Sequence, residues 1–129
     1  MADNAFINRG TKIVRVQLTS STNPTIIFSG KAVVQHILLF SSLASPTFVK
    51  LYDKSSLPTS SDTPIITTRF NTTTSAAYPQ ISAGLKRTLD YFCENGIALR
   101  TTANVDDSDD TAITISSGVR WVYVEYLEV

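Results

Sequence analysis

The chain has very few residues suited to nucleophilic or metal chemistry. Among its 129 residues there is a single cysteine, Cys93, and a single histidine, His36. One cysteine excludes an intrachain disulfide and a CxxC metal or redox site. One histidine excludes a His-rich metal site and any mechanism that needs paired histidines. The sequence therefore predicts no catalytic residues, no metal site and no cofactor.

Charge is also scarce and balanced. Charged residues make up 17% of the chain, with 11 basic and 11 acidic residues and a formal net charge of zero. A nucleic-acid-binding domain normally carries a basic patch, and a membrane-surface protein carries a polybasic segment. Neither nucleic acid nor a membrane is therefore an expected partner.

Long apolar runs are missing as well. The longest run, residues 37–40 with residues 32–34 nearby, is interrupted by Gln35 and His36 and is too short to span a bilayer. Residues 1–9 contain no apolar stretch of the signal-peptide type. We therefore expect a neutral protein that is made in the cytoplasm.

Hydroxyl side chains and short β-type runs take the place of these features. The chain contains 17 Thr and 15 Ser, and Thr favours strands whereas Ser favours turns. Apolar runs with a two-residue period recur every ten to fifteen residues, separated by Ser, Asn, Asp, Pro and Gly. The runs expected to be strands or extended segments are residues 11–18, 25–28, 31–40, 47–52, 65–70, 78–83, 85–92, 97–102, 112–115 and 119–129.

Two hairpins are expected between neighbouring runs. The short connection between residues 31–40 and 47–52 favours antiparallel pairing of these runs. Asn95-Gly96 is typical of a type I′ turn, which would pair residues 85–92 with residues 97–102. The run 31–40 is ambiguous, because its apolar residues do not separate a central strand from a short helix.

The last run, residues 119–129, carries large side chains on both faces. Trp121 and Tyr123 share one face, and Val122, Val124 and Tyr126 share the other. Both faces should therefore meet protein, either at the centre of a sheet or at a partner subunit. Together these patterns predict a single domain over residues 1–129, with residues 1–10 as an N-terminal arm. Its predicted fold is an all-β, antiparallel β-sandwich resembling a jelly roll, with about eight to ten strands.

The remaining polar residues have ordinary structural interpretations. His36 lies in an apolar strand with no GxSxG element in the chain, so we interpret it as structural or interfacial. Cys93 has an aromatic and an acidic neighbour and is interpreted as a partly buried structural thiol. The acidic segment, residues 104–110, lacks the EF-hand spacing, and a solvated loop without an obligatory metal is expected.

One pattern resembles a known family. Residues 48–54 (FVKLYDK), a Ser-rich loop and residues 62–65 (DTPI) are similar to small structural proteins of tailed bacteriophages. The resemblance continues through residues 95–98, the acidic loop, residues 111–113 and residues 124–126, and covers roughly residues 34–127.

The resemblance implies a capsid decoration (cement) or head-associated protein that is not an enzyme. Such a protein would sit on the capsid surface of the virion as a homotrimer, bind the major capsid protein and stabilise the mature head. It transfers no site residue. Aromatic side chains are the candidates for interfaces; they are Trp121, Tyr123, Tyr126 and Tyr52.

Two other functions stay open. A carbohydrate-binding or fibre-head module would use exposed Tyr and Trp rings to stack on sugars. A small hydrolase would need His36 exposed in a cleft beside an acid.

Overall fold

The protein is described by a computed structural model over residues 11–41, 46–70, 80–81, 87–115 and 120–129. These residues form nine strands and no helix. The strands are β1 (Lys12–Gln17), β2 (Thr25–Ser29), β3 (Ala32–Ser41), β4 (Thr47–Tyr52), β5 (Ile66–Phe70), β6 (Gln80–Ile81), β7 (Arg87–Cys93), β8 (Gly96–Thr102) and β9 (Arg120–Glu128).

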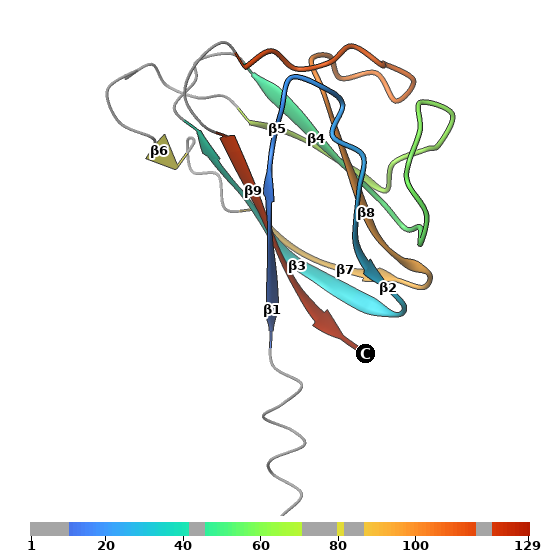
Figure 1. Cartoon of the computed structure of the whole chain (residues 1–129). Coiled ribbons are helices and arrows are strands. Elements are labelled where there is room, and N and C mark those ends of the chain that lie inside the picture. Colours follow the sequence, from blue (N-terminus) through green and yellow to red (C-terminus); the bar gives the residue numbers. More distant parts are fainter. Residues whose placement is uncertain (1–10, 42–45, 71–79, 82–86, 116–119) are drawn as a thin grey trace, which may run out of the picture.

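The strands build two antiparallel sheets. Sheet A has the order β1-β9-β3, with β6 and β7 both pairing with the far side of β3, and sheet B has the order β2-β8-β4-β5. Figure 1 shows the two layers, with β1, β9 and β3 in one and β8, β4 and β5 in the other. The prediction of an antiparallel β-sandwich is therefore confirmed.

The topology is that of a jelly roll. The chain passes from one sheet to the other at each connection except those between β4 and β5 and between β6 and β7. Since β6 and β7 share one edge of β3, the two sheets offer four strand positions each, as in an eight-stranded jelly roll. In the described part of the chain, no helix is long and apolar enough to cross a membrane.

This topology corrects both expected hairpins. β3 and β4 are neighbours in sequence but lie in different sheets, as do β7 and β8. β4 pairs with β5 and β8, and β7 pairs with β3. Proximity in sequence favoured pairing, but a sandwich buries the apolar faces of both sheets when successive strands alternate between them.

The turn at Asn95-Gly96 is a crossing between sheets. The residues with positive φ in the described chain are Asn23, Gly30 and Asp90, so Asn95-Gly96 does not form a type I′ turn. The Asp53 carboxylate instead accepts hydrogen bonds from the backbone N–H groups of Glu94, Asn95 and Gly96, at 3.0, 2.8 and 3.3 Å. The turn is thus tied to the end of β4.

A further expectation, a strand over residues 112–115, is wrong. These residues have no regular ladder; the N–H of Ile113 donates to the Ser21 carbonyl and that of Ile115 to the Ser20 hydroxyl. These isolated hydrogen bonds hold the segment in place, and the Ile113 side chain packs in the core.

The last run is a central strand, one of the two alternatives left open by the sequence. β9 pairs with β1 on one side and with β3 on the other. Arg120, Val122, Val124 and Tyr126 are buried toward sheet B, whereas the side chains between them are only half-buried. The inner face supplies the core, and the outer face stays accessible.

Gly96 offers a direct test of the crossing. A Cβ atom at this position would lie 2.7 Å from the Phe28 carbonyl oxygen and 2.8 Å from the Lys54 carbonyl oxygen. Both atoms are backbone, so relief requires the strands to shift. We expect Gly96→Ala to lower the free energy of unfolding by about 1–3 kcal/mol in urea denaturation. The neighbouring variant Glu94→Ala should change it by less than about 0.5 kcal/mol; equal effects would contradict the crossing geometry.

Asp53 makes the same turn dependent on pH. Burial by itself raises the pKa of Asp53. The three N–H donors outweigh this effect and hold the pKa of Asp53 below its ordinary value of 3.8. Since the folded pKa is the lower one, Asp53 stabilises the fold above about pH 4. This contribution is lost as the pH falls through the folded pKa. The stability gap between wild type and Asp53→Ala should therefore narrow in acid, as measured by urea unfolding between pH 7 and pH 2. A gap that is constant over this range would refute the role of the carboxylate.

Candidate functional site

A β-bulge in β3 controls which side chains reach the outer face of sheet A. The register of β3 shifts between Val34 and His36 against both β7 and β9. Without the extra residue, Gln35, strict alternation would put Val34 and His36 on the same face. Val34 and Ile37 are instead both fully buried, and His36 lies outside with about a quarter of its side chain exposed. The bulge also explains why the apolar pattern of this run has no clear period.

The bulge brings His36 beside an acid. His36 and Glu125 are register partners on β3 and β9, and Nδ1 of the imidazole lies 2.9 Å from Oε2 of the carboxylate. The side chains are 23% and 28% exposed, so this pair is neither fully hydrated nor buried. The sequence did not predict this contact, because cross-strand register depends on the bulge.

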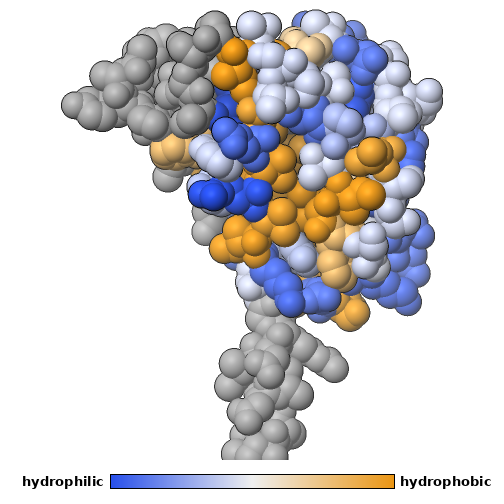
Figure 2. Space-filling view, in the orientation of Figure 1, coloured by the Kyte–Doolittle hydropathy of each residue, from blue (hydrophilic) through white to orange (hydrophobic). Residues whose placement is uncertain are grey.

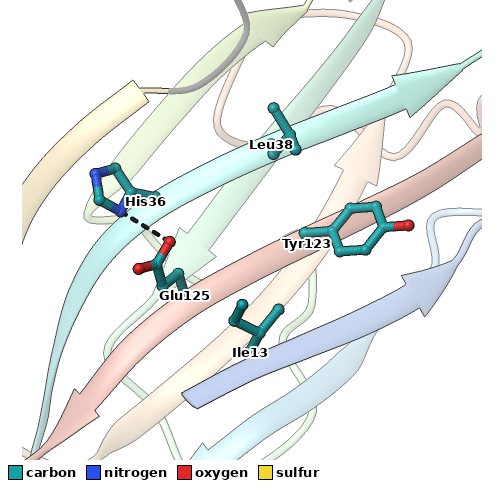
Figure 3. Close-up of a pocket in the computed structure, with 5 residues that line it drawn as sticks. All are labelled: Ile13, His36, Leu38, Tyr123 and Glu125. Atoms are coloured by element: carbon teal, nitrogen blue, oxygen red, sulfur yellow. Dashed lines mark hydrogen bonds and ion pairs between the residues drawn. The ribbon is translucent and has the colours of Figure 1, made fainter. Parts of the chain in front are cut away.

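The pair closes one end of a shallow pocket on the outer face of sheet A. The pocket has a volume of about 150 Å³ and is lined by Ile13, His36, Leu38, Tyr123 and Glu125. Figure 3 shows these side chains rising from β1, β3 and β9 on one side of the sheet, with the Tyr123 ring along the side opposite His36. Apolar groups and one ring make up most of its wall.

The pocket holds two of the three groups that a nucleophilic triad needs. An imidazole beside a carboxylate is the base and orienting acid of a nucleophilic triad, as the hydrolase alternative required. The five lining residues include neither a serine nor a cysteine. Cys93 is buried, and burial, with the nearby charge of Asp53, raises its pKa to about 11, so its thiol is not a nucleophile at neutral pH.

The four aromatic interface candidates separate into two pairs. Tyr52 and Tyr126 are 1% and 5% exposed, with Tyr52 accepting a hydrogen bond from Nε of Arg100 and Tyr126 packing on Phe28. Their rings therefore have almost no surface to offer. Trp121 and Tyr123 lie half-buried on the outer face of sheet A, and the Arg15 guanidinium sits 4.2 Å from the centroid of the Trp121 ring.

The acidic loop lies over the middle of the outer face of sheet B. Lys50 and Arg100 are register partners on β4 and β8, and both are almost completely buried. Lys50 donates to the Asp106 carbonyl oxygen. Arg100 donates to the Asp109 carbonyl oxygen at 2.9 Å and pairs with the Asp110 carboxylate at 2.8 Å. The buried cations of Lys50 and Arg100 thus balance part of the negative charge of residues 104–110.

The loop also organises itself. The Asp109 carboxylate accepts hydrogen bonds from the Asn104 and Thr111 backbone N–H groups and from both side chains. Burial by itself raises the pKa of Asp109. These hydrogen bonds outweigh burial and hold the pKa of Asp109 below its usual value. In the part of the chain that the structure describes, no group of three or more His, Cys, Asp or Glu side chains is arranged to hold a metal.

The buried cations were missed in the sequence because Lys50 follows the strand alternation like a solvent-facing residue. Burial and the neighbouring Arg100 charge lower the pKa of Lys50. The sequence did contain a signal for this contact. Lys50 and Arg100 are basic residues within β-type runs, and residues 104–110 are rich in Asp, so their opposite charges favour a contact.

Comparisons with protein-family models, with curated proteins and with solved structures give no match to the chain.

Arg100 and Asp110 allow the tether of the loop to be tested. Arg100→Met removes donors to two backbone carbonyls, to Tyr52 and to Asp110, and we expect a loss of about 2 kcal/mol or more in the free energy of unfolding. Asp110→Ala should cost less than about 1 kcal/mol, because the Asp110 side chain is 70% exposed. Urea denaturation measures both. If Asp110→Ala costs as much as Arg100→Met, the surface ion pair rather than the buried donors holds the loop.

Proposed function

We propose that the protein is a non-enzymatic structural component of a tailed-bacteriophage virion, a capsid decoration protein that assembles as a homotrimer. It binds the major capsid protein on the capsid surface and stabilises the mature head. The observation that carries this proposal is the difference between the two outer faces of the sandwich.

The acidic loop covers the middle of sheet B, whose edge-strand residues Ile26 and Arg69 are exposed, whereas sheet A is not covered by any described segment. Lys50 and Arg100 dock the acidic loop over sheet B. On sheet A, an accessible surface that we call the open face is formed by Ile13, Arg15, His36, Leu38, Trp121, Tyr123 and Glu125. A half-buried ring or aliphatic side chain gains apolar burial when a partner covers it.

The composition of the open face is typical of an interface centre. Aromatic residues and Arg are enriched in the buried centre of protein interfaces, and Trp, Tyr and Arg dominate the binding energy. Trp121, Tyr123 and Arg15 lie together on this face. Figure 2 shows, in addition, a band of apolar residues across the middle of one side of the molecule. These features support association with protein.

A decoration role also suits the rest of the molecule. A closed sandwich with a tethered loop is a rigid unit, and rigid units lose little conformational entropy on binding. Three copies held together present three equivalent surfaces, so weak individual contacts to a coat lattice add up to tight binding. A protein that binds only the expanded shell stabilises that shell by mass action.

Carbohydrate binding is the second candidate, and the pocket favours it specifically. The Tyr123 ring can stack on a sugar, and the Glu125 carboxylate and the His36 imidazole can accept hydrogen bonds from the sugar hydroxyl groups. Saturable binding of a saccharide to the isolated protein, lost in Tyr123→Ala, would favour this function over decoration.

Light scattering tests assembly through the open face. We expect the wild-type protein to have the mass of a trimer and Tyr123→Ser to weaken self-association about thirtyfold, as for a residue contributing about 2 kcal/mol. Leu57→Ser is the matched control, because Leu57 is an exposed apolar residue, at 54%, between β4 and β5. A wild type that is monomeric at every concentration would reject the trimer, and equal effects of both variants would reject the open face. The cement role is tested separately, since a decoration protein must copurify with virus particles at stoichiometric copy number.

A further inference from the structure

The pocket on the open face has the size and charge to hold one small organic cation. Ligand sites for drug-sized molecules and cofactors usually have volumes of about 300–1,000 Å³. This pocket, at about 150 Å³, is smaller and accommodates a single side chain or a fragment of that size. Its occupant must therefore be compact.

The only acidic group among the lining residues is Glu125, and it is only partly engaged. His36 contacts Oε2 of Glu125, and no hydrogen bond from a described residue engages Oε1. The two basic residues on β1 have other partners: Lys12 pairs with Glu128 at 2.9 Å, and Arg15 lies over Trp121. Within the described residues, Glu125 thus has no partner with a permanent positive charge.

The walls define the rest of the occupant. Ile13, Leu38 and the Tyr123 ring offer apolar surface to an aliphatic stem, and Glu125, at the side of the pocket opposite the Tyr123 ring, attracts a positive charge at the end of that stem.

From this arrangement we infer that the pocket is a binding site for the cationic end of a Lys or Arg side chain presented by a protein partner. Glu125 pairs with the charge, His36 positions the carboxylate, and the apolar walls hold the aliphatic stem. This inference deepens the proposed function, because it names the side chain that the open face receives.

The test is a titration of the isolated protein, diluted until light scattering shows it to be monomeric so that the open face is free, followed by NMR of its backbone amides. The probe is Nα-acetyl-lysine methylamide, and its neutral counterpart is Nα-acetyl-norleucine methylamide, which has the same stem without the ammonium group. We expect saturable shifts of Leu38, Tyr123 and Glu125 with the lysine probe and at least tenfold weaker binding of the norleucine probe.

Variants locate the charge. Glu125→Gln keeps the shape of the side chain and should reduce lysine-probe affinity to that of the norleucine probe. Glu128→Gln removes an equal charge from the end of the same strand, outside the pocket, and should leave the affinity within twofold.

Three results would overturn the inference: no saturable binding of the lysine probe up to about 50 mM, equal affinity for the two probes, or unchanged affinity in Glu125→Gln. The comparison of the two probes uses wild-type protein, so it holds even if a variant misfolds. Failure here combined with recovery of the protein on virus particles would reject the cation site and leave the decoration role standing.

Discussion

The β-bulge at Gln35 is the constraint on which the core and the candidate site both depend. β3 is the strand with most partners, pairing with β9, β7 and β6. One extra residue lets Val34 and Ile37 both enter the core and turns His36 to the surface beside Glu125. A regular strand would instead bury an imidazole or expose Ile37, at the cost of an unsatisfied polar group or of lost apolar burial.

The described residues cover the middle of the two sheets to different extents. Burying Lys50 and Arg100 is costly unless their donors find acceptors. The backbone carbonyls of the acidic loop supply these acceptors, and the four Asp side chains of the loop supply opposite charge. The loop is thereby fixed over sheet B. Sheet A has no such internal cover among the described residues, and the aromatic and aliphatic side chains of the open face remain half-buried or, at Ile13, exposed.

Fold class followed from the sequence, whereas pairing did not. Two-residue alternation is a local property, so runs such as residues 47–52 and the last strand were located almost to the residue. Which strands pair is a property of the whole sandwich. Asn95-Gly96 has the composition of a hairpin turn, but the Asp53 carboxylate and the close approach of two carbonyls to Gly96 make it a crossing. Contacts with residues that are distant in the sequence thus outweigh the local turn preference of Asn95-Gly96.

The candidate site was only partly predictable for the same reason. Trp121 and Tyr123 were recognised because they share one face of a strand, which alternation reveals. Tyr52 and Tyr126 belong to the same class of residue, yet they point to buried positions that depend on Arg100 and Phe28. The His36–Glu125 pair joins residues 89 positions apart, and only the bulged register brings them together.

Under the proposed function, a protein partner covers the open face. Hydroxyl-radical footprinting of the isolated protein and of the protein in purified virus particles tests this most directly. Trp121 and Tyr123 should be oxidised in isolated protein that is diluted until it is monomeric, and protected in the particles, while Leu57, exposed in a loop between β4 and β5, is oxidised equally in both. Equal oxidation of Trp121 and Tyr123 in the two samples, or absence of the protein from the particles, would contradict the account.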